Sequence, residues 1–144
     1  MRVVIDTNKL VSIIGKKSSF RWIFDSIAIG NLEICVSTEI ILEYREILER
    51  KTNLGVAENI SEFLKVSPSV IKTDTFFRFN LIQKDSTDNK FVDCAISGDV
   101  DHIVSNDKHF QILKTIGFPK VNIITLEEFD SLYKSEILKH PKKY

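Results

Sequence analysis

Short apolar segments alternate with longer amphipathic ones along most of this sequence, and this alternation constrains the fold more than any other feature. Segments typical of buried strands cover residues 2–5, 32–36, 102–105 and 121–125, and a weaker one covers 70–72. Strands that alternate with helices form parallel sheets, which are joined by right-handed crossovers and covered by helices on both faces. We therefore predict an α/β fold on a parallel sheet whose central strand is the first one.

The amphipathic spacing of the remaining segments predicts the helices. They cover residues 19–29, 37–51, 56–65, 89–97, 108–116 and 126–133. The polar stretch 83–89 is typical of a loop, and we expect the tail from about residue 134 to fray. The sequence shows no internal repeat and no linker, so we expect a single domain over residues 1–144.

The composition limits the classes of protein to which this chain can belong. Its 144 residues are 43% hydrophobic and 28% charged, which suits one globular domain with a core. The 20 basic residues balance the 20 acidic ones, so any contact with a nucleic acid must be local. No apolar run approaches the ~20 residues that cross a bilayer, and we expect a cytoplasmic protein. Cys35 and Cys94 lie in apolar segments and are expected to be buried thiols.

Three aspartates fall at the ends of predicted strands and at the start of a predicted helix. Asp6 directly follows the strand 2–5, Asp107 follows the strand 102–105, and Asp88 precedes the helix after the polar loop. Each aspartate alone could simply cap a helix or a turn. In parallel α/β sheets, however, ligands bind beyond the carboxyl ends of the strands, where these residues are expected.

Glu43 is a fourth acid with an unusual position. It lies three residues after Ile40 and four before Ile47, which places it on or beside the apolar stripe of its predicted helix. An unpaired carboxylate is expensive to bury, although a salt bridge could also satisfy it. Four converging carboxylates would repel unless a cation offset them, and an all-oxygen cluster suits Mg²⁺ or Mn²⁺. Such ions can activate a water and orient a phosphodiester, so we predict phosphate chemistry.

Four short motifs in order carry a resemblance to a known family. They are VVIDTN at 3–8, VS at 36–37 leading to LEY at 42–44, DSTDNKF at 85–91, and HIVSNDKHF at 102–110. Together they resemble the PIN domain, the fold of many bacterial and archaeal toxin ribonucleases of the VapC type. The resemblance implies a three-layer α/β/α sandwich with a four- or five-stranded parallel sheet and a ribonuclease that depends on Mg²⁺ or Mn²⁺.

The same resemblance assigns roles to individual residues and implies partners. Asn8 and Ser105 become polar groups that support the site, and the acids that hold the metal and carry catalysis become Asp6, Glu43, Asp88 and Asp107. RNA is the implied substrate. The family pattern also implies a homodimer and, in toxin members, an antitoxin protein whose segment covers the active site.

Three aspartates are candidates for the third acid, because Asp85 and Asp93 compete with Asp88 for that role. We favour Asp88, which ends the polar loop just before the helix, and assign Asp93 as an additional metal ligand through water. Asp93 lies five residues further on, about 140° around the helix, so its side chain is expected to be exposed to solvent.

Two other functions are compatible with parts of this sequence. Asp6 sits where a phosphatase with an aspartate nucleophile would carry it, but such enzymes need a second aspartate where Asn8 stands. A non-catalytic module that binds RNA or an antitoxin-like peptide would be expected to lack one or more acids, and all four are present. Lys108 and His109 could contact an RNA backbone, or could simply be solvated.

Overall fold

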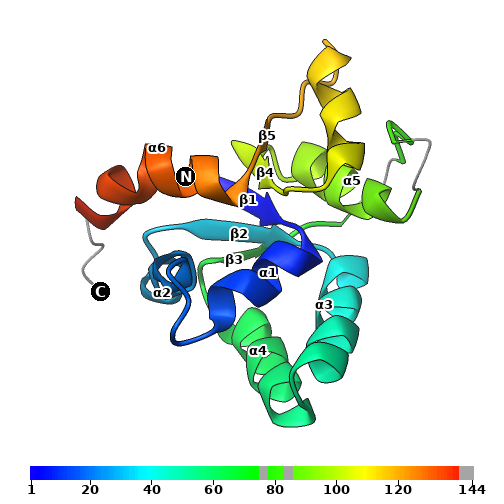
Figure 1. Ribbon diagram of the computed structural model, residues 1–144. Helices are drawn as coiled ribbons and strands as arrows, with labels where there is room; N and C mark the ends of the chain where they lie inside the picture. The colour runs from blue at the N-terminus through cyan, green and yellow to red at the C-terminus, as the bar shows by residue number, and fades with distance from the viewer. Residues whose placement is uncertain (75–77, 83–85, 140–144) are drawn as a thin grey trace.

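A five-stranded parallel sheet forms the centre of the computed structural model, which describes residues 1–74, 78–82 and 86–139 (Figure 1). The strand order is β3-β2-β1-β4-β5, and every pairing is parallel. The strands are β1 (Arg2–Ile5), β2 (Glu33–Val36), β3 (Val70–Lys72), β4 (His102–Val104) and β5 (Ile123–Ile124). The first strand of the chain is therefore the central one, as predicted.

Helices surround this sheet. They are α1 (Thr7–Ile14), α2 (Arg21–Ile29), α3 (Thr38–Lys51), α4 (Leu54–Val66), α5 (Asn89–Ser97) and α6 (Leu126–Lys139), with 3-10 helices η1 (Ser86–Asp88) and η2 (Lys108–Thr115). Figure 1 shows α1, α3 and α4 on one side of the sheet, and α5 and the yellow η2 on the other. This confirms the predicted three-layer α/β/α architecture. Among the described residues, no helix is both long enough and apolar enough to cross a membrane.

The central strand explains why the sheet needs both layers. Val3, Val4 and Ile5 are at most 1% exposed, since a parallel strand covered on two faces has no polar side. On α3, Ile40, Tyr44 and Leu48 recur every four residues and are buried together. Sequence patterns of this kind were sufficient to predict both elements.

Local capping sets several of the helix boundaries. The hydroxyl of Ser37 accepts a hydrogen bond from the backbone N–H of Ile40 and starts α3, and the side chain of Asn53 starts α4 in the same way. Gly30 ends α2 with φ 88°, a left-handed conformation that a residue without a Cβ adopts readily.

The largest differences from the predicted elements concern α1, η2 and α6. Helix α1 was not predicted, because the turn signals around Asp6 mask an amphipathic segment that buries Leu10 and Ile13. The predicted helix 108–116 is the 3-10 helix η2, and α6 runs through Lys139, although the tail was expected to fray from about 134. Buried Ile137, whose carbonyl accepts from the Asn31 amide, anchors this last stretch. The rest of that tail, residues 140–144, lies outside the described residues.

Both cysteines are free and buried, as expected. Burial raises the pKa of the Cys35 thiol to about 12 and that of the Cys94 thiol to about 11. At neutral pH both thiols therefore stay protonated and act as small apolar groups.

Candidate active site

The carboxyl ends of β1 and β4 bring two of the predicted acids next to each other. The backbone N–H of Asp6, just after β1, donates to the carbonyl of Val104 at 3.1 Å. Ser105, fully buried at the end of β4, donates its hydroxyl hydrogen to Oδ2 of Asp6. The same hydroxyl oxygen accepts the backbone N–H of Asp107 at 3.0 Å. Ser105 thus links Asp6 to the segment that carries Asp107.

Asp6 is both a helix cap and a buried acid. Its Oδ1 accepts the backbone N–H of Lys9 at 3.0 Å and starts α1, while the side chain is only 7% exposed. Burial is the main cause that raises the pKa of Asp6; the Ser105 hydrogen bond lowers it and the negative charge of Asp107 raises it further. Capping therefore accounts for one carboxylate oxygen only.

Glu43 is half-buried on α3, and two contacts hold its carboxylate. Thr7 donates its hydroxyl hydrogen to Oε2, and the Lys90 ammonium lies 2.8 Å from Oε1. The salt bridge that the sequence left open as an explanation for Glu43 is thus present. Neither Thr7 nor Lys90 was predicted to contact Glu43. The sequence offered one signal for them, because Thr7 directly follows Asp6 and Lys90 lies two residues after Asp88.

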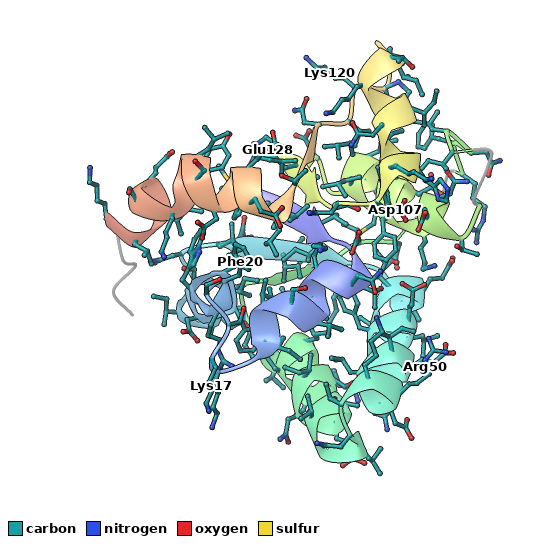
Figure 2. All side chains as sticks on the ribbon, in the orientation of Figure 1. Lys17, Phe20, Arg50, Asp107, Lys120 and Glu128 are labelled. Atoms are coloured by element: carbon teal, nitrogen blue, oxygen red, sulfur yellow. The ribbon has the colours of Figure 1, made fainter. Side chains whose placement is uncertain are left out.

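Asp88, Asp107 and His109 form the tightest cluster of potential metal ligands among the described residues. One ligand atom from each lies within 4.8 Å of the others. The Nδ1 atom of His109 is 3.4 Å from Oδ1 of Asp107 and 3.7 Å from Oδ2 of Asp88. Figure 2 shows Asp107 on the side of the sheet where α5, α3 and the start of α1 come together.

Capping explains these two aspartates to different extents. Asp107 does cap η2, because its Oδ1 accepts the backbone N–H of His109 at 2.9 Å. Asp88 occupies the position before α5, yet its side chain makes no capping hydrogen bond. The capping explanation offered for Asp88 is therefore wrong.

Asp93 was expected to be exposed, and that expectation is wrong. Its side chain is 3% exposed and its Oδ1 accepts the backbone N–H of Phe79 at 3.1 Å. Burial raises the pKa of Asp93, whereas the Phe79 hydrogen bond and the charge of Arg78 lower it. The helical angle was a poor guide, because the segment containing Phe79 covers this face of α5.

Two further predicted residues lie outside this arrangement. Asn8 is exposed, and its Oδ1 accepts a hydrogen bond from Lys51 at 3.0 Å. Asn8 was expected to support the acids, but its neighbour Thr7 is the residue that contacts one of them, Glu43. Asp85 lies outside the described residues, so its competition with Asp88 stays a sequence-based question.

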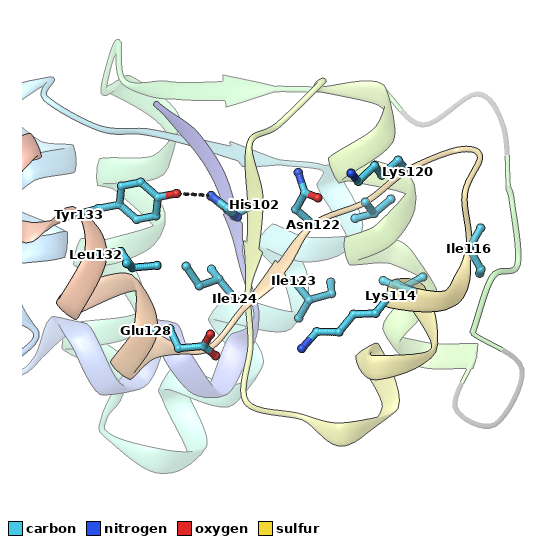
Figure 3. A pocket seen from close by; sticks show the side chains of 12 residues that line it. His102, Lys114, Ile116, Lys120, Asn122, Ile123, Ile124, Glu128, Leu132 and Tyr133 are labelled. Carbon is cyan, nitrogen blue, oxygen red and sulfur yellow. Dashed lines mark hydrogen bonds between the residues drawn. The ribbon is translucent and has the colours of Figure 1, made fainter.

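His109, one member of this cluster, borders a hollow of about 940 Å³. His109 lines it together with Lys108, Leu81 and Ile112. A smaller hollow of about 370 Å³ lies at the β5 edge, where His102 and Tyr133 share a 3.1 Å hydrogen bond (Figure 3). Of these two hollows, the larger is the one lined by a residue of the Asp88–Asp107–His109 cluster.

Comparison with known proteins decides the family. A family model for the PIN domain matches residues 2–109, a range that contains the four predicted acids. The chain belongs to the PIN domain family. PIN domains are generally nucleases that use divalent metal ions. The comparison with curated proteins gave no match.

Solved structures that share this fold include two VapBC complexes. A structure of VapBC2 from Rickettsia felis bound to a promoter DNA fragment is 16% identical, with a TM-score of 0.59, covering 87% of this chain and 98% of that one. DNA-bound VapBC from Salmonella typhimurium is 18% identical, with a TM-score of 0.56, covering 88% of this chain and 98% of that one. At this level of identity the likeness concerns the fold.

The donor atoms of this PIN domain fit a divalent ion. Carboxylate oxygens of Asp88 and Asp107 and a ring nitrogen of His109 already lie at spacings that one ion can bridge. Without a cation, the two neighbouring carboxylates would repel each other. Asp6 and Glu43 approach the same edge of the sheet through Ser105, Thr7 and Lys90.

Proposed function

We propose that this protein is a metal-dependent endoribonuclease and the toxin of a toxin–antitoxin pair. The observation that carries the proposal is the proximity of the Asp88 and Asp107 carboxylates at the carboxyl edge of the sheet, in a chain of a nuclease family. Asp6 is tied to the same edge through Ser105. The inferred reaction is hydrolysis of RNA phosphodiester bonds.

The proposed metal site uses Asp6, Glu43, Asp88 and Asp107 to hold Mg²⁺ or Mn²⁺. Such an ion supplies a water with a lowered pKa and a positive charge for the leaving oxygen. For Asp93 the proposal keeps only a water-mediated contact, because its Oδ1 is already bound to the Phe79 amide. Asn8 has no supporting role in the proposal, since its side chain bonds to Lys51.

The supporting residues hold the acids in place. Ser105 orients Asp6 by donating to Oδ2, which leaves Oδ1 for the cap of α1. Thr7 and Lys90 hold the two oxygens of Glu43 and join α3 to α1 and α5. Because these contacts come from separate elements, the carboxylates are positioned before substrate binds.

RNA suits the surface beside the acids. The adjoining hollow of about 940 Å³ offers apolar Leu81 and Ile112 to a base and the ammonium of Lys108 to a phosphate. The balanced net charge of +0 requires such local contacts, because no overall field attracts a polyanion.

An antitoxin partner and a homodimer belong to the same proposal. The two structures compared above come from VapBC assemblies, and almost the whole of each matched chain aligns with this one. The proposal places the protein in the cytoplasm with its RNA substrate. Light scattering of the purified chain, with and without the product of an adjacent small reading frame, tests both assemblies.

Cleavage of a mixed single-stranded RNA pool tests the catalytic function. The antitoxin-free protein should cut RNA with Mn²⁺ and stop when a chelator is added. Asp6→Asn should lower the rate by about 10²- to 10³-fold, the effect of removing one group that stabilises the transition state. Asp25→Asn, a change in an exposed carboxylate of α2, is the matched control and should keep the parent rate.

Two outcomes would contradict this proposal. Chelator-resistant cleavage that is equal in the parent and in Asp6→Asn would exclude the metal-dependent mechanism. Metal binding without cleavage of any RNA would favour the non-catalytic module, which binds RNA or an antitoxin without hydrolysis.

A further inference from the structure

His109 lies against two of the proposed metal-binding acids. The proposed site of four carboxylates assigns no role to this histidine. Its Nδ1 is 3.4 Å from Oδ1 of Asp107 and 3.7 Å from Oδ2 of Asp88. We propose that Nδ1 of His109 is a direct nitrogen ligand of the ion held by Asp88 and Asp107, and that it makes the site prefer Mn²⁺ over Mg²⁺. This inference rests on the proposed function, because it assumes that the acids bind an ion.

The spacing of the three side chains is compatible with their sharing one ion. A good N–H···O bond measures ~2.7–3.2 Å between heavy atoms, and both distances from Nδ1 are longer. Ligands at ~2.1 Å from a six-coordinate ion lie ~3.0 Å apart on an edge and ~4.2 Å apart across it. The observed separations of 3.4 and 3.7 Å exceed the edge value of ~3.0 Å by less than ~1 Å, so a shift of that size would let the side chains share one ion.

The position of His109 is imposed by packing and by the backbone. Its backbone N–H donates to Asp107 at 2.9 Å, so the cap of η2 holds the histidine beside that carboxylate. The next residue, Phe110, is fully buried and meets Phe91 of α5 edge-on, with ring centroids 6.4 Å apart. Because Asp88 directly precedes α5, this aromatic contact also fixes Asp88 relative to His109.

An imidazole changes which ions the site favours. Mg²⁺ binds oxygen ligands almost exclusively and keeps several waters, whereas transition metal ions accept imidazole nitrogen readily. Two carboxylates with one imidazole are therefore expected to bind Mn²⁺ more tightly than Mg²⁺. Removing the nitrogen should reduce this preference while leaving an oxygen site for Mg²⁺.

Pulsed electron paramagnetic resonance of Mn²⁺ bound to the full chain tests the nitrogen ligand directly. The unmodified protein should show a ¹⁴N hyperfine coupling that becomes a ¹⁵N coupling after histidine is isotopically labelled. His109→Gln should abolish the coupling. His102→Gln, in β4 and bonded to Tyr133, should retain it, and so should His140→Gln, whose position lies outside the described residues.

Calorimetric titration with Mn²⁺ and with Mg²⁺ gives a second readout that does not depend on activity. His109→Gln should weaken Mn²⁺ binding by about 10- to 100-fold, the range for losing a group that supports a metal site. Mg²⁺ binding should weaken less, so the ratio of the two affinities should fall.

The outcomes separate this inference from the proposed function. A parent protein that binds Mn²⁺ through Asp88 and Asp107 without a histidine coupling would overturn the His109 assignment alone. A coupling that persists in folded His109→Gln would do the same. A parent protein that binds neither ion would overturn the metal site and this inference together. The labelling experiment needs no substitution, so a variant that fails to fold leaves the test intact.

Discussion

Asp6 uses its two carboxylate oxygens for two purposes. Oδ1 caps α1 through the backbone of Lys9, and Oδ2 accepts from Ser105, beside the segment that carries Asp107. A helix cap tolerates asparagine about as well as aspartate. The negative charge itself is therefore not required for the cap, and a buried charge carries a desolvation cost.

This cost predicts a pH dependence for the metal-free protein. Burial in the folded protein raises the pKa of Asp6 above its ordinary value of 3.8. The stability that this proton contributes is therefore complete below pH 3.8 and is lost as the pH rises through the raised pKa. Asp6→Asn cannot ionise, so the variant does not lose stability in this way as the pH rises. The variant should be more stable than the parent near pH 7.5, and the difference should shrink as the pH falls toward 3.8.

Urea unfolding with a chelator present, at several pH values, measures this difference. Asp25→Asn serves as the control, since the Asp25 side chain is 61% exposed and should show no such gain. The explanation fails if Asp6→Asn is less stable than the parent at neutral pH, or if the difference grows on acidification.

Among the elements, α5 makes the most consequential contacts. Its N-terminal end carries Asp88 and Lys90, and Lys90 reaches Glu43 on α3. Its C-terminal end meets β2 so closely that Gly98, which follows the helix, has no room for a side chain. A Cβ on Gly98 would lie 2.8 Å from Sγ of Cys35 and 3.1 Å from the carbonyl oxygen of Cys94.

Gly98→Ala should therefore destabilise the protein by about 1–3 kcal/mol, the usual cost of overpacking a core. Gly117→Ala is the matched control, because a Cβ there meets nothing within 4 Å, and it should be neutral or stabilising by up to about 1 kcal/mol. Chemical unfolding of both variants measures the contrast.

A double-mutant cycle identifies the contact responsible. Cys35→Ala removes the sulfur that a Cβ on residue 98 would meet, so the cost of Gly98→Ala should be smaller in that background. Equal costs in the two backgrounds would mean that the Cys94 carbonyl contact dominates instead.

For the whole molecule, metal binding and folding are expected to be coupled. The acids come from segments far apart in the chain, after β1, on α3, before α5 and after β4, and only the folded sheet gathers them. An ion that binds the folded state at ~100 times its dissociation constant adds ~2.7 kcal/mol of stability. Adding Mn²⁺ should thus raise the melting temperature by several degrees.

Thermal unfolding with Mn²⁺, and with a chelator at matched ionic strength, measures this coupling. Asp88→Asn should lose most of the gain, whereas Asp25→Asn should keep it. An equal gain in the parent and in Asp88→Asn would mean that the stabilising ion binds elsewhere.

Local patterns in the sequence determined most elements of the fold. The predicted bounds of the strand 2–5 and of the helix 89–97 agree with β1 and α5, because buried strands and amphipathic helices record their own packing in their spacing. The predicted parallel order placed Asp6 and Asp107 at one sheet edge for the same reason. Helix α1 was not predicted, because the residues at its N-terminal cap are equally typical of a turn.

Only the tertiary structure decided which side chains meet. The contacts of Ser105 with Asp6 and of Lys90 with Glu43 span 99 and 47 residues, respectively, and depend on strand order and helix packing that no local pattern encodes. The burial of Asp93 under the segment containing Phe79 depends on a neighbour, and the angle around its own helix does not predict it. His109 lies between two acids because Phe110 anchors η2 against α5. Periodicity reports which face of an element is buried, whereas long-range packing determines what that face touches.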